Sequence, residues 1–159
     1  MQHMFFDKIL KIIFFVASLG YVGVSSAHDA GATMDPHGIV ASFTGFAMIT
    51  CTSSGSVPTD YLEASIRDDS LPQDGLLVNL QLIHVGSGIN RAISTTDPVS
   101  GDGKFSPDVK LHGGNGTYLL LVNKTAAGAR SFLVSYHCKS ADTPPVHTET
   151  DISVVYQFE

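Results

Sequence analysis

Alternation of apolar and polar residues with a period of two dominates the chain after residue 38. Apolar side chains take every second position in four long stretches: 39–51, 76–84, 132–138 and 152–158. Shorter strand candidates are 61–67, 91–95, 108–112 and the continuous apolar run 118–122. We therefore expect strands and no long helix after the N-terminal segment.

Turn-forming residues separate these stretches. The clearest groups are Ser54-Gly55, Gln73-Asp74-Gly75, Gly86-Ser87-Gly88, Gly101-Asp102-Gly103 and Gly113-Gly114-Asn115-Gly116. Seven or eight short strands with such turns predict an all-β fold, an antiparallel β-sandwich of the immunoglobulin-like or jelly-roll-like kind. We expect one domain over 39–159, preceded by a loose N-terminal arm over 28–38.

The N-terminal segment, 1–27, has the features of a secretory signal peptide. Lysines stand at the start of an apolar run, 9–24, and small residues precede a cut after Ala27. A cut after Ala32 is the alternative, and only the first cut makes His28 the new N-terminus. A retained membrane anchor is less consistent with the run, which is shorter and more interrupted than the roughly 20 apolar residues of a span. We expect a periplasmic or extracellular protein with no stable membrane insertion after cleavage.

The two cysteines, Cys51 and Cys138, both fall on the predicted inward faces of strands. In an exported chain this predicts one disulfide across the core. Closing so long a loop stabilises the folded state by about 4 kcal/mol in the chain-entropy model. Two buried free thiols are the alternative.

The composition limits the classes of function. The chain has 159 residues, of which 43% are hydrophobic and 15% charged, and its formal net charge is −6. The hydrophobic content excludes intrinsic disorder, and the negative charge disfavours a nucleic-acid partner. No nucleophile motif of a hydrolase is present, so we expect a protein that is not an enzyme.

Histidine is the enriched reactive residue. If the precursor is cut after Ala27, the α-amine and ring of His28 could hold one copper ion, with a second histidine completing the ligand set, because such nitrogen donors suit Cu(II). We consider His37 and His84 for the second position. The alternative is that these histidines are ordinary residues of loops and strand ends.

The loop with Asp97, Asp102 and Asp108 is an alternative cation site. Its carboxylates and carbonyls could bind Ca²⁺, although the spacing is not that of an EF-hand and Lys104 lies close by. Asp-Gly is also a common hairpin turn, so the loop is more typical of a turn than of a calcium site.

Two short segments resemble known families. The hairpin over 113–138, from Gly114-Asn115-Gly116-Thr117-Tyr118 to Tyr136, is similar to the closing hairpin of bacterial pre-peptidase C-terminal domains, which are secreted β-sandwich accessory modules. That resemblance implies an accessory module and transfers no functional residue. Tyr136-His137-Cys138 resembles the Tyr-x-Cys of immunoglobulin-type domains, but the core tryptophan of that family is absent.

The sequence therefore predicts an exported, non-catalytic β-sandwich module that binds a protein or a glycan and needs no cofactor. A periplasmic copper-binding protein is the first alternative. A subunit of a larger exported assembly is the second, with Leu77, Ile83 and Leu133 as a docking patch opposite the predicted core faces.

Overall fold

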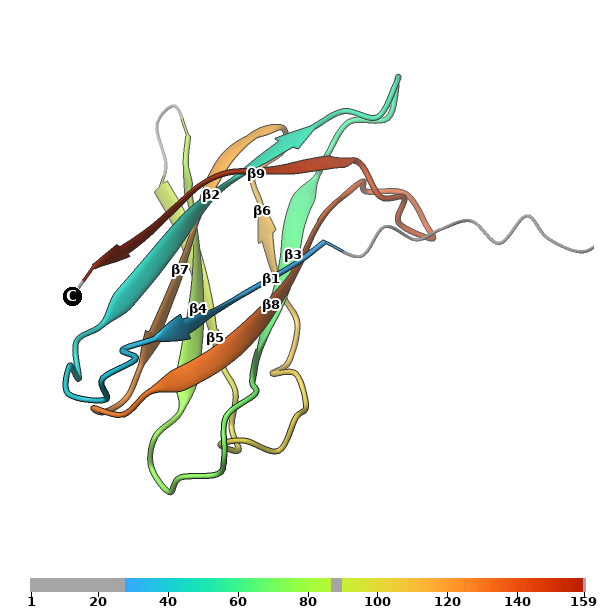
Figure 1. Cartoon of the computed structure of the whole chain (residues 1–159). Coiled ribbons are helices and arrows are strands. Elements are labelled where there is room, and N and C mark those ends of the chain that lie inside the picture. Colours follow the sequence, from blue (N-terminus) through green and yellow to red (C-terminus); the bar gives the residue numbers. More distant parts are fainter. Residues whose placement is uncertain (1–27, 87–89, 159) are drawn as a thin grey trace, which may run out of the picture.

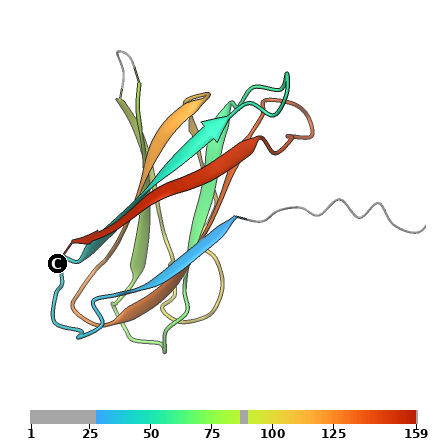
Figure 2. The ribbon, with the colours of Figure 1, turned by 45° about the horizontal axis from the view of Figure 1, so that its top comes forward.

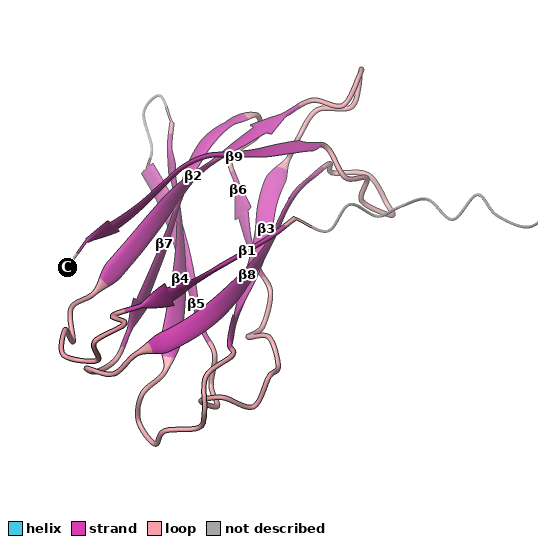
Figure 3. Cartoon of the chain, in the orientation of Figure 1, coloured by secondary structure: helices cyan, strands magenta, loops and turns pink. Residues whose placement is uncertain are grey.

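The computed structural model describes residues 28–86 and 90–158, and these form an all-β fold (Figures 1 and 3). The predicted signal peptide, 1–27, lies outside the described residues. The strands are β1 (Asp29–Met34), β2 (Thr44–Thr52), β3 (Tyr61–Asp68), β4 (Val78–Val85), β5 (Asn90–Thr96), β6 (Val109–His112), β7 (Gly116–Lys124), β8 (Arg130–Lys139) and β9 (Glu149–Phe158). Across the described ranges, no helix is long and apolar enough to cross a membrane.

The strands form two antiparallel sheets that pack face to face, as the two layers of Figure 2 show. Sheet A has the order β1-β8-β3-β6, and sheet B has the order β5-β4-β7-β2-β9. The predicted β-sandwich is confirmed. The structure has one more strand than the upper end of the predicted range, and β1 is the addition.

Alternating side chains build the core as the pattern predicts. Along β4, Val78, Leu80 and Leu82 are fully buried, and along β8 Val134 and Tyr136 face inward. One cluster of buried side chains joins both sheets. Burial of this apolar surface is the main favourable contribution to folding.

The disulfide between Cys51 and Cys138 is present and connects β2 of sheet B to β8 of sheet A. Both residues are completely buried. The bond therefore joins the two layers through the core, 87 residues apart in sequence.

The predicted loose arm is wrong for residues 29–34. These form β1, which pairs antiparallel with β8 from Asp29 opposite Ser135 to Met34 opposite Arg130. The segment is too short and too rich in small residues to show alternation, so its strand conformation comes from the edge of β8 rather than from its own sequence.

The strand predicted from residue 39 begins instead at Thr44. The Asp35 carboxylate accepts hydrogen bonds from the backbone N–H groups of Ile39 and Val40, both at 3.0 Å, and from Lys124 Nζ at 2.7 Å. Burial alone would raise the pKa of Asp35, but these bonds hold it well below its usual range. They keep this segment as a loop, with Ile39 77% exposed.

The pairing of β9 with β2 contains an irregularity. A register shift places Ile152 opposite Ile49 but Val154 opposite Met48, two neighbouring residues of β2. Such a shift arises from strand pairing, which an alternating sequence pattern does not reveal. The alternation predicted for 153–158 concerns side chains outside the described ones.

The two sides of the sandwich differ. On one side the edge strands β5 and β6 contact each other and close the gap between the sheets. On the other side the edge strands are β1 and β9, and the views of Figures 1 and 2 show them apart. An apolar cavity lies at this second side, which we call the open side.

Candidate functional site: an apolar cavity beside a free strand edge

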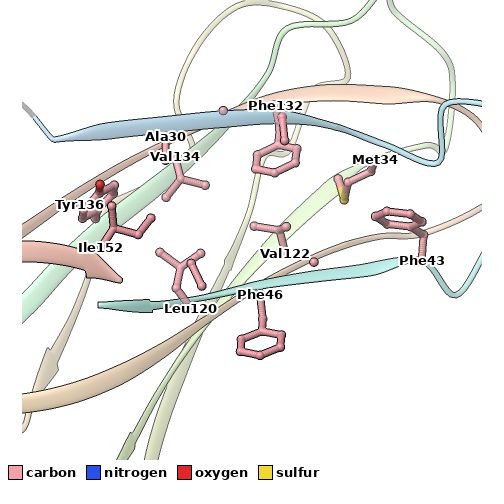
Figure 4. A pocket seen from close by; sticks show the side chains of 14 residues that line it. Ala30, Met34, Phe43, Phe46, Leu120, Val122, Phe132, Val134, Tyr136 and Ile152 are labelled. Atoms are coloured by element: carbon pink, nitrogen blue, oxygen red, sulfur yellow. The ribbon is translucent and has the colours of Figure 1, made fainter. Parts of the chain in front are cut away.

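The cavity lies between the two sheets at the open side and has a volume of about 80 Å³. Figure 4 shows side chains of sheet A, among them Phe132 and Val134, pointing toward Leu120 and Val122 of sheet B. Of the described side chains that line it, only Tyr136 carries a polar atom. Burial raises the pKa of the Tyr136 hydroxyl, with added effects of Asp151 and Asp29, so this group stays protonated near neutral pH.

Small residues on β1 explain why the cavity exists. The residues of β1 opposite the buried face of β8 are Ala30, Ala32 and Met34, and only Met34 is fully buried. Two alanines cannot fill the space above Phe132 and Ile152, which remain partly exposed. An extra apolar side chain that entered here would lose its contact with water and gain packing contacts.

Along the same opening, β1 is an edge strand, and its outer backbone groups pair with no other strand that the structure describes. Tyr136 donates its N–H to the carbonyl oxygen of His28 at 2.9 Å, which makes these two residues a hydrogen-bonded pair. Because such pairs alternate in an antiparallel ladder, the N–H and C=O groups of Asp29, Gly31 and Thr33 point away from β8. A free row of this kind is a template for another strand.

The three histidines proposed as copper ligands lie in separate places. His28 precedes β1 and lies beside Tyr136, with ring centroids 6.0 Å apart. His37 is exposed in the loop after the other end of β1. His84 is on β4 in sheet B, where it packs on Tyr118 with centroids 4.6 Å apart. The structure does not bring these three together.

The acidic residues proposed as calcium ligands take part in loop structure. Asp97 is 1% exposed, and its two oxygens accept hydrogen bonds from the N–H groups of Asp68, at 2.8 Å, and Val99, at 3.2 Å. Asp102 accepts from the N–H of Lys104 and pairs with its ammonium group, and Asp108 is exposed just before β6. Asp97 thus orders the connection between β5 and β6.

The three residues proposed as a docking patch also lie apart from one another. Ile83 lies on the outer face of sheet B, opposite Leu119 of β7. Leu133 lies on β8, opposite Gly31 and Arg67, and Leu77 precedes β4. All three are partly buried, on different parts of the surface.

A polar hollow of about 250 Å³ lies beside β4, β5 and β7. Its amide side chains bond to one another: Asn79 donates to Asn123 at 2.8 Å and accepts from Thr96 at 2.7 Å, while Gln81 donates to Ser94 at 3.3 Å. These bonds connect the three strands, as cross-strand pairs do. They use one N–H each of Asn79 and Gln81, so the hollow keeps amide N–H groups that can donate to a ligand.

Sequence reasoning missed the cavity because no single segment encodes it. Its lining comes from five strands and from Phe43, and the free edge belongs to a segment interpreted as a loose arm. The one available signal was the run of small residues in 30–32, which suits close backbone pairing. A Cβ on Gly31 would lie 2.8 Å from the carbonyl oxygen of Phe132.

Comparison with known proteins gives no relative from which to transfer a function: no family model matches the chain, and neither a curated protein nor a solved structure is significantly similar to it. The resemblance of 113–138 to pre-peptidase C-terminal domains stays a prediction.

Proposed function

We propose that this chain is an exported, non-catalytic β-sandwich module that binds an extended segment of a partner protein along the free edge of β1. The apolar cavity at the open side is the observation that carries the proposal. Beside it lies a row of unpaired backbone groups, and an extended peptide is the ligand that uses both features at once.

The geometry gives the ligand an alternating pattern. A strand paired with Asp29, Gly31 and Thr33 would point every second side chain between the sheets and the others toward solvent. The apolar lining favours an aliphatic or aromatic side chain at the inward positions. The main chain would supply most of the affinity, and the cavity would supply the specificity.

Other ligand classes fit this opening less well. A glycan needs many hydroxyl and amide partners, and the described lining offers the Tyr136 hydroxyl alone. Catalysis needs converging acids, bases or nucleophiles, which this lining lacks. The disulfide is consistent with an oxidising compartment, where an exported module would meet its partner.

Hydrogen exchange with a defined peptide tests the proposal. The probe is a short synthetic peptide in which valine and threonine alternate, and its control has the same composition with the valines in one block. We expect the alternating peptide to slow exchange of the Asp29, Gly31 and Thr33 amides about tenfold at ten times its Kd. The block peptide should have no effect.

Four variants locate the binding site. Ala32→Leu should fill the cavity. Thr33→Pro removes one N–H from the free edge and keeps the backbone hydrogen bonds to β8, but it also removes the bond between Thr33 Oγ1 and Ser131 Oγ. Both should weaken peptide binding at least tenfold, whereas Ala92→Leu, on exposed β5, should leave it unchanged. Thr33→Val, which also lacks the hydrogen bond between Thr33 Oγ1 and Ser131 Oγ but keeps the N–H, is the control for Thr33→Pro and should bind as the unmodified protein does. Equal binding by all variants would overturn the proposal. A second contrary result is slower hydrogen exchange of the same amides in the absence of peptide, if it appears as the protein concentration and the mass of the particle both increase. A second copy of the chain would then occupy the edge of β1.

A further inference from the structure

Three histidines from distant segments gather on β8 and its edge. His137 belongs to β8, His28 immediately precedes β1, and His147 lies in the segment that follows β8. The ring centroid of His137 is 6.2 Å from that of His28 and 4.8 Å from that of His147. We call these residues the histidine trio.

Backbone pairing fixes where the trio lies. One edge of β8 is occupied first by β1, as far as His28, and then by the segment around His147, which forms an isolated bridge to Lys139. Thr148 of this segment donates its N–H to the carbonyl oxygen of Cys138 at 2.9 Å. His28 and His147 therefore approach His137 from two sides.

The spacing of the rings matches that of imidazoles around one metal ion. A metal–nitrogen distance of about 2.0–2.1 Å places the ion about 3 Å from each ring centroid. Two rings on one ion then have centroids about 4.5 to 6.5 Å apart, depending on the angle at the metal. Both distances in the trio fall inside that interval.

One ring nitrogen of His137 is available as a metal ligand. Nδ1 of His137 is buried and has no hydrogen-bond partner among the described residues, while its Nε2 lies 3.2 Å from Ser135 Oγ. An unsatisfied buried nitrogen is costly, and a bound metal would remove that cost. Burial lowers the pKa of His137 and of His147, with added effects of His147 on His137 and of Lys139 on both.

The surrounding charges do not prevent a cation from binding. Lys139 is the nearby positive group, and it pairs with Glu63, while Asp29 adds a negative charge. As the side chains stand, the described residues include no group of three or more His, Cys, Asp and Glu placed to hold a metal. Completing the site therefore requires rotation of at least one ring, and His28 and His147 lie outside the long strands.

We propose that the histidine trio binds one late transition-metal ion, Cu(II) or Zn(II), with His137 and His147 as the first pair and His28 as the third ligand. Imidazole nitrogens suit these ions, and Cu(II) should bind more tightly than Zn(II). In this proposal His28 is a metal ligand, as predicted from the sequence, but its partners are His137 and His147 instead of His37 or His84.

Titration with each metal salt alone tests the site in the exported protein. We expect one equivalent of Cu(II) or Zn(II) by native mass spectrometry and by calorimetry. Bound Cu(II) should show nitrogen hyperfine structure in its electron paramagnetic resonance spectrum. The thermal midpoint should rise with metal concentration, because the ion binds only the folded state.

Substitutions assign the ligands. His147→Ala, at an exposed position, and His28→Ala should each weaken binding by at least about 10- to 100-fold, the loss expected even for a partner outside the first coordination sphere. His37→Ala, also exposed, is the matched control and should bind as the unmodified protein does. Absence of metal binding at micromolar concentrations would overturn the proposal. Unchanged binding in both the His147→Ala and the His28→Ala variants would also overturn it, and so would loss of binding in the His37→Ala variant.

Discussion

Two buried ion pairs hold the loops at one end of the sandwich. Lys124 bonds to Asp35 and to the carbonyl oxygens of Val40 and Ala126, at 2.7 and 3.0 Å. Arg130, 3% exposed, bonds through Nη1 to Asp68 and to the carbonyl oxygen of Leu71, and through Nη2 to Gln73. Buried charges are stable only with such partners, so each pair fixes the loops that supply them. Nε of Arg130 is the exception, since it is buried without a hydrogen-bond partner among the described residues.

Replacing Arg130 should therefore lower stability far more than replacing the partly exposed Arg67. Arg130→Met leaves the Asp68 carboxylate buried without its cation, and we expect the free energy of unfolding to fall by about 3–5 kcal/mol. Arg67→Met removes an ion pair with Asp69 in which both side chains are partly exposed, and should cost at most about 1 kcal/mol. Urea unfolding of both variants gives the two values, and equal losses would contradict this explanation.

At the scale of elements, the alternating pattern predicted most strands. It failed where contacts with residues distant in sequence determine the backbone conformation. Positions 78, 80 and 82 of β4, and position 76 just before it, are buried as the pattern requires, because alternate residues of a strand face the same side. The interpretation failed for β1, whose conformation comes from β8, and for residues 39–43, where the Asp35 carboxylate captures backbone N–H groups. Both depend on partners far away in sequence, which a local pattern does not contain.

The connection between β5 and β6 allows a test of close packing in a loop. Gly101 and Gly103 have similar positive φ angles, 66° and 70°. A Cβ on Gly101 would lie 2.5 Å from the carbonyl oxygen of Ser70, whereas one on Gly103 would meet nothing within 4 Å. Gly103→Ala should cost about 1 kcal/mol for the left-handed backbone alone.

Gly101→Ala should add the steric cost of overpacking, about 1–3 kcal/mol more. Thermal or urea unfolding of the two variants under one buffer condition measures the difference. Should both variants lose the same stability, the contact between this turn and the loop at Ser70 would not be rigid.

At the scale of the whole molecule, the candidate sites arise from assembly of the sandwich. The cavity forms because β1 and β9 end the two sheets without meeting, and the histidine trio forms because two segments share one edge of β8. The sequence led to the prediction that His28 binds a metal, which stays a prediction, but it did not show which histidines lie near His28. His137 was recognisable as an outward residue of a strand, whereas the position of His147 depends on a bridge that follows a loop.

The disulfide is the covalent link between the two sheets, so its removal should affect the molecule as a whole. The double variant Cys51→Ala/Cys138→Ala should lose about 4 kcal/mol, because the unfolded chain is no longer closed into a loop of 87 residues. Reduction of the unmodified protein should shift the urea midpoint in the same direction without any change of side-chain volume. The hydrophobic core remains in both cases, so the far-ultraviolet circular dichroism of a β-sandwich should be retained in buffer. Unfolding of the reduced protein in buffer would show that the core alone does not hold the sheets together, and an unchanged midpoint would show that the link contributes little.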